Sequence, residues 1–357
     1  MLQSLLCDTV QLSTGDSLLV LNSAWDPFVL QAAQQLGAHS EQGGKITLAE
    51  DNIGSLQVAL SALNSLPSEK RPHVQHVPFH EYTLHNPMAT MDVAVMNLLY
   101  QPSNAWMLHG LEVADYALKP GGRLYVEGAK DRGILTIAKR LQEYFGNVET
   151  LEIKKGHRLV CSRRDDRGQP TNGGISRSDR LEMLIPGFAK GNLDEGTRLL
   201  LEALEVFLTD EALDIGCGAG FLGIHIARRA GKGHVTMVDA SLAAVAAAQC
   251  MVEKSGLTNV EVLPSDGTQA VLSRRFDLVV TNPPFHLGGT QTTGVAERFI
   301  REAAQVLRPR GRFYLVANRF LKYEPTLRAC FRTVEEVGGD TRYKVIRSEN
   351  ALLHRSI

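Results

Sequence analysis

The sequence has few of the features that mark secreted proteins, membrane proteins or strongly basic nucleic-acid-binding proteins. Its five cysteines are scattered along 357 residues without paired spacing, so we expect neither a disulfide framework nor a structural zinc site. The formal net charge is only −1, which excludes a global basic surface for nucleic acid. No apolar run approaches the length of a transmembrane helix, and no basic segment precedes the first apolar residues. We therefore expect a soluble, cytoplasmic protein without a metal.

What the chain does contain is an ordinary share of apolar residues, 44%, arranged in alternating strand-like and helix-like segments. Strands in the second half are predicted at 211–217, 233–240, 259–266, 276–282 and 310–318. Helices are predicted at 241–256, between an N-cap at Ser241 and a stop at Gly256, and at 294–307. This alternation predicts a mostly parallel sheet covered by helices on both faces.

The first half repeats the same rhythm more faintly, with predicted strands at 16–24, 45–51 and 92–100. The clearest match pairs LKPGGRLYVEGAK (118–130) with LRPRGRFYLVANR (307–319), each predicted as a helix end, a Pro-Gly turn and a strand. We infer an internal duplication. The predicted domains are 1–165 and 184–357, joined by a polar, glycine-containing linker at 166–183.

A glycine-rich turn follows the first strand of the second half, in LDIGCGAGFLG (213–223). Gly216, Gly218 and Gly220 allow backbone conformations closed to other residues and a close approach to a ligand. A dinucleotide fingerprint would need G-x-G-x-x-G, but Phe221 stands at the third glycine position. The loop therefore favours a ligand without phosphates over NAD.

Acidic residues end the neighbouring strands at the same predicted sheet edge. Asp239 ends the second strand, where a carboxylate can accept from both ribose hydroxyls, and Asp266 ends the third, where it can accept from an adenine amine. Loop and acids together resemble the class I S-adenosylmethionine-dependent methyltransferases. The resemblance implies that Asp214 lies near the cofactor amino group, Asp239 at the ribose and Asp266 at the adenine.

The fourth strand runs into TNPPFH (281–286), where two prolines break it abruptly. An exocyclic amine has two N–H groups, and the side-chain oxygen of Asn282 can accept from one while the backbone carbonyl of Pro283 accepts from the other. Pro284 stiffens the turn, Phe285 offers a face for a flipped base, and His286 is a weaker candidate for assistance. The residues leave the acceptor open, because adenine, guanine and glutamine amines all fit such a clamp.

More of the chain carries a narrower resemblance. N-P-P-F, the segment LIPGFAKGNLDEGTRLLLEAL (184–204) and RFYLVANRFLKYEPTL (312–327), preceded by a degenerate copy, are similar to bacterial ribosomal RNA guanine-N2 methyltransferases, chiefly the 16S family. This implies methyl transfer from S-adenosylmethionine to a guanine 2-amino group in small-subunit ribosomal RNA. It also implies two tandem Rossmann-like α/β domains with seven-stranded sheets, the first degenerate. The family's P-G-F…L-D-x-G-[ST] stretch lies over the cofactor and corresponds to Phe188, Asp194, Gly196 and Thr197, although GFAKGN departs from the usual pattern.

Roles toward RNA are predicted for residues after the fifth strand and for the first half of the chain. Arg319 and Lys322 follow the fifth strand and are predicted to contact RNA phosphate. In the first half Asn97 persists, but Leu98 and Leu99 replace the prolines and NSAW (22–25) replaces the glycine loop. We interpret that half as a non-catalytic scaffold that positions RNA.

Other functions remain open at this point. The same clamp would serve a large-subunit ribosomal RNA guanine, an adenine N6 amine or a protein glutamine. A non-enzymatic, cofactor-binding RNA assembly factor is a further alternative, against which the intact N-P-P-F argues. With two domains in one chain, we expect a monomer.

Overall fold

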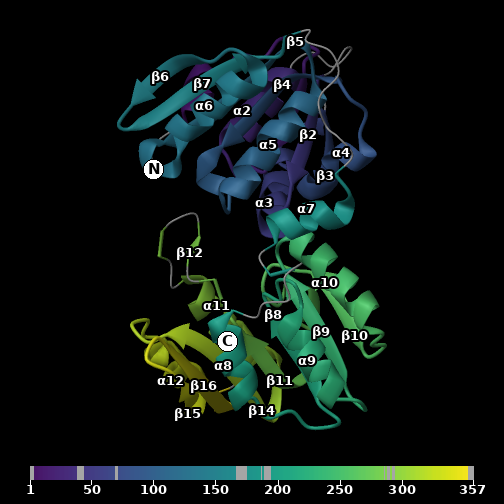
Figure 1. Cartoon of the computed structure of the whole chain (residues 1–357), viewed down its shortest axis with the longest axis vertical. Coiled ribbons are helices and arrows are strands. Elements are labelled where there is room, and N and C mark those ends of the chain that lie inside the picture. The colour runs from purple at the N-terminus through teal and green to yellow at the C-terminus, as the bar shows by residue number, and fades with distance from the viewer. Residues whose placement is uncertain are drawn as a thin grey trace. The chain divides into compact units, whose positions relative to one another are not determined.

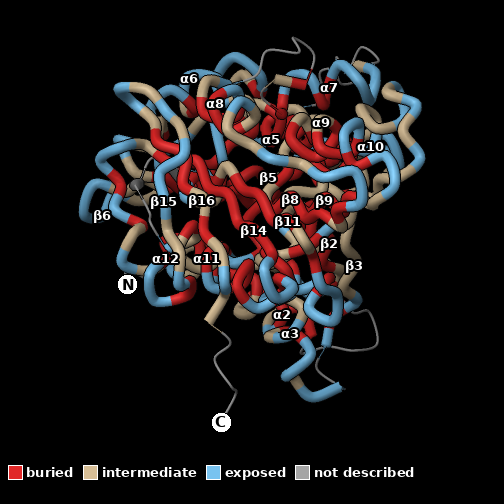
Figure 2. The backbone as a smooth tube through the Cα atoms, turned by 90° about the horizontal axis from the view of Figure 1, so that it is seen from below, coloured by how far each residue is buried: buried red, intermediate tan, exposed pale blue. Residues whose placement is uncertain are grey.

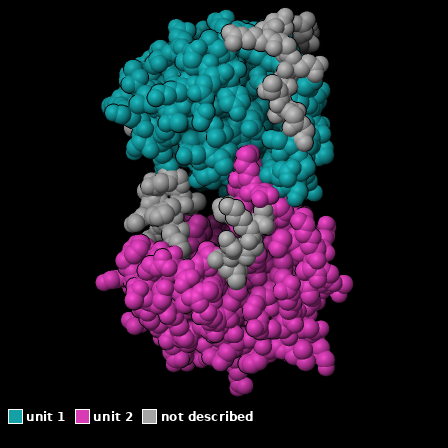
Figure 3. Space-filling model, viewed as in Figure 1, with its two compact units in different colours: residues 1–180 teal, residues 181–357 magenta. Residues whose placement is uncertain are grey.

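The computed structural model describes residues 4–37, 44–68, 71–165, 175–185, 187–188, 194–284, 286–287, 290–291 and 294–352. The chain divides into two compact units, Met1–Arg180 and Leu181–Ile357 (Figure 3). Helix α7 (Arg177–Leu184) begins inside the predicted linker and crosses this boundary, whereas residues 166–174 lie outside the described part of the chain. Each unit is described by itself below.

The first unit is built on a seven-stranded sheet in the order β3-β2-β1-β4-β5-β7-β6 (Figure 1). Strand β7 is antiparallel to β5 and β6, and the other pairings are parallel. The strands are β1 (Ser17–Leu21), β2 (Lys45–Glu50), β3 (His73–Pro78), β4 (Met91–Asn97), β5 (Leu118–Ala129), β6 (Glu149–Lys154) and β7 (His157–Arg163). The helices are α1 (Leu5–Thr9), α2 (Phe28–Gly37), α3 (Ile53–Asn64), α4 (Tyr82–His85), α5 (Asn104–Ala117) and α6 (Ile134–Phe145), with 3-10 turns η3 (Phe79–Glu81), η4 (Leu98–Tyr100) and η5 (Lys130–Arg132).

The second unit repeats this topology in the order β10-β9-β8-β11-β14-β16-β15, with β16 antiparallel to both neighbours. The strands are β8 (Glu211–Ile215), β9 (His234–Asp239), β10 (Val260–Pro264), β11 (Phe276–Thr281), β14 (Leu307–Asn318), β15 (Phe331–Gly339) and β16 (Tyr343–Ala351), with a separate hairpin of β12 (His286–Leu287) and β13 (Thr290–Gln291). The helices are α8 (Glu195–Ala203), α9 (Phe221–Arg229), α10 (Leu242–Ser255), α11 (Gly294–Val306) and α12 (Glu324–Cys330), with the turn η6 (Gln269–Val271). The predicted duplicated α/β fold is confirmed.

Most predicted elements lie within two residues of their observed bounds. Helix α10 is capped as expected: the Ser241 hydroxyl accepts from the N–H of Ala244, and Gly256 takes the left-handed conformation that ends it. The predicted Pro-Gly turns are different in detail. They lie inside β5 and β14, and β5 accommodates its turn as a bulge: its partners in β4 advance from Met91 to Val93 while β5 advances from Leu118 to Arg123.

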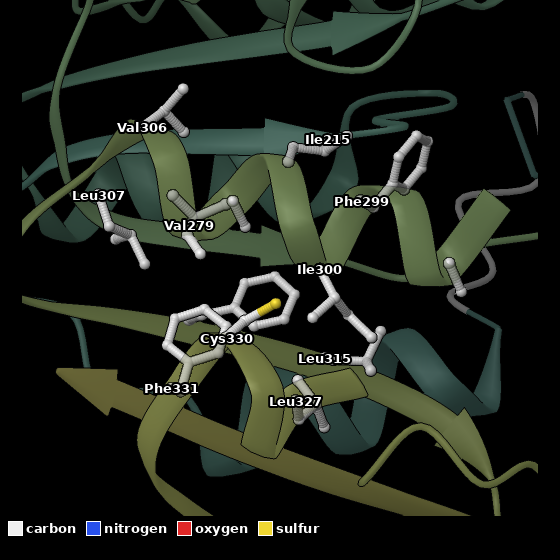
Figure 4. Close-up of a cluster of buried hydrophobic side chains, with 14 of the residues drawn as sticks. Ile215, Val279, Phe299, Ile300, Val306, Leu307, Leu315, Leu327, Cys330 and Phe331 are labelled. Carbon is white, nitrogen blue, oxygen red and sulfur yellow. The ribbon is translucent and has the colours of Figure 1, made fainter. Parts of the chain in front are cut away.

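The core of the second unit forms on both faces of its sheet, because alternate strand residues point to opposite sides. Leu213, Val279 and Leu315 belong to a cluster that contains the apolar sides of α11 and α12 (Figure 4). Ala212 and Val280 belong to a second cluster that contains residues of α8, α9 and α10. Strand β14, inside the sheet, is therefore buried from Gly311 to Ala317, whereas the edge strand β15 is largely exposed (Figure 2).

The strand registers within the two sheets match, so each position in the first sheet can be assigned an equivalent position in the second. Val20 lies beside Val95 in the first sheet, and Asp214 lies beside Val280 in the second. The residue after Leu21 thus corresponds to the residue after Ile215, and Asn97 corresponds to Asn282. No helix in the described ranges is long and apolar enough to cross a membrane.

Candidate active site

The glycine turn lies at the carboxyl end of β8, between the strand and α9. Gly216, Gly218 and Gly220 all have positive φ, +74°, +54° and +87°. The backbone N–H groups of Gly216 and Cys217 both donate to the carbonyl of Val238 on β9, at 2.8 and 3.0 Å. A Cβ added at Gly218 would meet nothing within 4 Å. The turn is therefore anchored at its base and has free space at its middle glycine.

Asp239 ends β9 beside this turn and braces it. One carboxylate oxygen accepts from the N–H of Gly218 at 2.9 Å, and the other accepts from the N–H of Ser241 at 2.8 Å. Burial nevertheless raises the pKa of the Asp239 carboxyl, against the lowering effect of these hydrogen bonds. Asp239 therefore joins the glycine loop to the start of α10.

Asp214 is fully buried next to the same loop. Its Oδ2 accepts from the N–H of Gly223 in α9 at 3.0 Å, while its Oδ1 has no hydrogen-bond partner among the described residues. Burial raises the pKa of this carboxyl to about 7, and the nearby Asp239 charge adds to the shift. A buried oxygen without a donor is costly unless a ligand or water supplies one.

Asp266 follows β10 at the same edge and is tied to helix α11. Its Oδ1 pairs with Nη2 of Arg298 at 2.5 Å, and Arg298 also contacts Glu302 at 3.3 Å. Glu302 in turn accepts from the N–H of Thr268 at 2.9 Å. The predicted adenine-binding acid is thus half-buried with one oxygen already paired to a cation.

Asn282 stands directly after β11, and its amide is held at one end. Its Nδ2 donates to Asp194 Oδ1 at 3.1 Å and to Thr197 Oγ1 at 3.0 Å. Within the described part of the chain, its Oδ1 accepts no hydrogen bond. Pro283 and Pro284 follow, and neither has an N–H that could reach back to that oxygen. The carbonyl end of the amide therefore has no donor among the described residues.

The contact between Asn282 and helix α8 was not predicted. The resemblance had placed Asp194, Gly196 and Thr197 over the cofactor, but two of them bond directly to the Asn282 amide. Asp194 is also the N-cap of α8, because its Oδ1 accepts from the N–H of Thr197 at 3.0 Å. The capping signature in DEGT was a readable signal for a helix start, but nothing local could indicate the partner 88 residues away.

The remaining predicted residues have different settings. Phe285 lies outside the described residues, and His286 lies on β12. Arg319 is exposed and pairs with Glu336 at 2.7 Å, and Lys322 is exposed. Phe188 is buried, with the Lys254 ammonium 5.2 Å from its ring centre. No group of three or more His, Cys, Asp or Glu side chains in the described chain is arranged to hold a metal ion.

The equivalent edge of the first unit is filled by its own side chains. Asn97 donates through Nδ2 to Asp26 at 2.8 Å, and its Oδ1 accepts from the N–H of Leu99 at 2.9 Å. The Ser4 hydroxyl oxygen lies 3.2 Å from an Asp26 carboxylate oxygen and 2.7 Å from a Glu127 carboxylate oxygen. All but Leu99 are buried. Both ends of the Asn97 amide are therefore committed within the protein.

Comparison with known proteins places these features in a family. Residues 183–347 match the family model described as Methyltransferase small domain. The chain is 33% identical to the ribosomal RNA small subunit methyltransferase C of Pseudoalteromonas atlantica over 72% of this chain and 77% of that protein. It is 33% identical to the protein of the same name from Pseudomonas entomophila, over 73% and 81%.

A solved structure resembles nearly the whole chain. The T. thermophilus 16S rRNA N2 G1207 methyltransferase (RsmC), determined in complex with AdoMet and guanosine, superposes with a TM-score of 0.77 at 26% identity, over 97% of this chain and 91% of that chain. The chain belongs to the ribosomal RNA small subunit methyltransferase C family and is a methyltransferase.

Proposed function

We propose that the chain transfers a methyl group from S-adenosylmethionine to the 2-amino group of a guanine in 16S ribosomal RNA, within the small subunit. The observation that carries this proposal is the Oδ1 of Asn282, which accepts no hydrogen bond from any described residue and stands at the end of β11 beside the glycine turn. The family membership and the 2-amino specificity in the name of the T. thermophilus relative support the choice of guanine. The carboxyl edge of an open α/β sheet is the usual place for such a ligand.

The residues at this edge suit S-adenosylmethionine, which supplies an electrophilic methyl group on a positively charged sulfur. Three glycines with positive φ let the backbone approach the ligand without side-chain interference. We assign the buried Oδ1 of Asp214, which has no hydrogen-bond partner among the described residues, the role of attracting the cofactor amino group through the loop or a water. Asp239 supplies a carboxylate at the ribose position, and Asp266 one near the adenine.

The target amine is a weak nucleophile because its lone pair is delocalised into the guanine ring. Two acceptors, Asn282 Oδ1 and the carbonyl of Pro283, hold its two N–H groups and direct the lone pair at the methyl carbon. The new N–C bond forms as the C–S bond breaks, and the nitrogen briefly carries a positive charge. That ammonium is acidic and releases one proton to solvent, so the site requires no strong base.

We assign the first unit a positioning role for RNA and no catalytic one. This proposal is supported by its filled carboxyl edge, where Asp26 and Leu99 occupy both ends of the Asn97 amide. Arg319 and Lys322 are proposed to contact RNA phosphate, Phe285 to stack on the base, and His286 to lie at the substrate. The monomeric state stays a prediction.

The test is a methylation assay with label on the cofactor methyl group. Purified protein is incubated separately with undermethylated small subunits, naked 16S RNA, large subunits and total protein, and the products are digested to nucleosides and amino acids. Labelled N2-methylguanosine from small subunits is expected. The same nucleoside from large subunits alone would change the substrate, and label in N6-methyladenosine or glutamine, or none at all, would overturn the proposal.

A further inference from the structure

The two ends of a side-chain amide have nearly the same shape, so packing alone does not decide how the Asn282 side chain is turned. The orientation matters, because only the oxygen accepts a hydrogen bond from an amine. If the amide turned over, its NH₂ would face the substrate and would repel the N–H groups it is meant to hold. Something in the second unit must therefore select one orientation.

The neighbours on helix α8 select it by their hydrogen-bonding polarity. An ionised Asp194 can only accept. The Thr197 hydroxyl donates its single hydrogen to Asp194 Oδ2 at 2.5 Å, so its oxygen faces Asn282 as an acceptor. Both neighbours therefore require a donor, and Nδ2 of Asn282 serves both at 3.1 and 3.0 Å. The opposite orientation would place a carbonyl oxygen against a carboxylate oxygen.

We propose that Asp194 and Thr197 are positioning residues that hold the Asn282 amide with its oxygen toward the substrate amine. This inference rests on the proposed function, since an oxygen needs to be presented only if an amine is to be held. Asp194 accepts from both the Thr197 hydroxyl and the Asn282 amide. Because the Thr197 hydrogen is directed at Asp194, the Thr197 oxygen can only accept from Asn282.

The first unit supports the assignment independently, because it holds its own amide the same way round. Nδ2 of Asn97 donates to a carboxylate, Asp26 Oδ2. Asp26 corresponds to Gly220, since the N–H of Asp26 bonds to Ser23 O as that of Gly220 bonds to Cys217 O. The second unit takes its carboxylate from α8 instead. The amide stays oriented while the loop position remains glycine and clear for a ligand.

Gly196 is the residue that lets α8 approach so closely. A Cβ at this position would lie 3.1 Å from Asp194 Oδ1 and 3.6 Å from Asn282 Nδ2. A side chain there would press on the one carboxylate oxygen that both caps the helix and holds the amide. The cap, the glycine and the threonine thus form one unit whose sequence is D-E-G-T.

The test compares kcat, the KM for cofactor and thermal stability in matched variants. Asp194→Asn keeps a good helix cap but no longer acts only as an acceptor, so we expect kcat to fall roughly 10- to 100-fold with the cofactor KM and melting temperature little changed. Thr197→Val should lower kcat by a similar factor, whereas Thr197→Ser keeps the hydroxyl and should retain the wild-type kcat. Glu195→Gln removes a neighbouring charge on α8 that pairs with Arg198 and serves as the control without effect.

Two further measurements separate positioning from a general structural role. In an Asn282→Ala background, Asp194→Asn should cause no additional loss, whereas a further tenfold drop in kcat would overturn the inference. Independently of activity, the side-chain NH₂ signals of Asn282 in nitrogen-15 spectra of the full chain, identified by their absence in Asn282→Ala, should shift or broaden in Asp194→Asn. Unchanged signals would also overturn it. A wild-type protein that labels no RNA would refute the proposed function, while the spectra still decide the amide orientation.

Discussion

The two units are most alike at the amino ends of their strands and least alike at the carboxyl ends. At the amino ends, Asp92 pairs with Lys119 at 2.7 Å and accepts from a backbone N–H of β1. Asp277 pairs with Arg308 at 2.6 Å and accepts from a backbone N–H of β8 in the corresponding place. These contacts tie the central strands together in both copies.

Even an unusual backbone conformation is kept at this end. Gly121 has a φ of +79°, and the corresponding Arg310 has a φ of +67° although it carries a side chain. The next residue is glycine in both copies, Gly122 and Gly311, and a Cβ there would lie 2.9 Å from the carbonyl oxygen of Lys119 and of Arg308, respectively. The shape of the bulge is therefore retained where sequence identity is only partial.

At the carboxyl ends the two copies carry different side chains, with different exposure, at equivalent backbone positions. Glu50 corresponds to Asp239, and each accepts from the loop after the first strand, from Ala24 N–H and Gly218 N–H. Glu50 is only 3% exposed, however, whereas Asp239 is half-buried. The comparison teaches that the contacts at the amino ends of the strands maintain the fold. The carboxyl ends can therefore either form a ligand site or be filled by buried side chains.

The largest expected effect concerns the amino-end ion pairs. Arg312 and Asp210 form a pair at 2.7 Å with side chains only 5% and 4% exposed, while the corresponding Arg123 and Asp16 are 3.5 Å apart and 28% and 15% exposed. Arg312→Met should destabilise the second unit by about 3–5 kcal/mol, and Arg123→Met should cost the first unit about 0–1 kcal/mol.

The measurement is calorimetric unfolding, with tryptophan fluorescence to isolate the first unit. Both tryptophans, Trp25 and Trp106, lie in that unit. Equal losses in the two variants would show that burial does not distinguish the two pairs.

The second prediction contrasts the two equivalent asparagines: replacing one should lower activity, and replacing the other should lower stability. Asn282→Ala should lower kcat about 100- to 1,000-fold, by analogy with the loss of a preorganised transition-state hydrogen bond, with little change in unfolding. Asn97→Ala should leave kcat unchanged and destabilise the first unit by about 1–3 kcal/mol, because it leaves the buried Asp26 short of a donor. Kinetics and fluorescence-detected unfolding of both variants check this, and an active Asn282→Ala protein would contradict the proposed clamp.

The third prediction introduces into the second unit the backbone hydrogen bond that occupies the asparagine oxygen in the first unit. In the first unit the N–H of Leu99 occupies Asn97 Oδ1, as in an Asx-turn. Pro284→Leu supplies an N–H at the corresponding place, so it should occupy Asn282 Oδ1 and lower kcat about tenfold, the equivalent of one ordinary hydrogen bond. The reverse change, Leu99→Pro, is the matched control and should not alter kcat. A Pro284→Leu enzyme with wild-type kcat would mean that the prolines serve rigidity alone.

The last prediction is a pH dependence of stability, to which one buried acid with a strongly raised pKa contributes in each unit. Burial raises the pKa of Glu50 from 4.5 to about 7 and that of Asp214 from 3.8 to about 7. Since the folded protein holds more protons than the unfolded chain in these windows, stability falls as pH rises from about 4 to 7. Asp214→Asn should flatten this slope in the second unit, and Glu50→Gln should flatten it in the first.

Unfolding at several pH values in the two variants provides the check. A slope that persists in Asp214→Asn would assign the proton uptake to another group, such as the neighbouring Asp239, whose pKa burial also raises.

Local patterns in the sequence were enough for the elements and their repetition. Alternating apolar segments, the Ser241 cap, the Gly256 stop and the glycine turn after β8 all predicted structure within a few residues, because helix caps, breakers and glycine turns act over one turn of chain. The duplication was readable for the same reason, since LKPGGR and LRPRGR each encode a bulge of the same shape. Asn282, the prolines and the acids at the strand ends were candidates because of their positions, whereas the resemblance supplied the role of Asp214.

The tertiary structure alone decided which way the functional groups face. The sequence by itself determined a duplicated α/β fold with one intact N-P-P-F and one degenerate copy. It did not determine that Asp194 and Thr197 reach Asn282, that Asp266 is paired with Arg298, or that Glu50 repeats the role of Asp239 in the closed copy. The physical reason is that hydrogen-bond polarity is set by side chains brought together from distant segments, whereas periodicity and capping are set by neighbours in the chain.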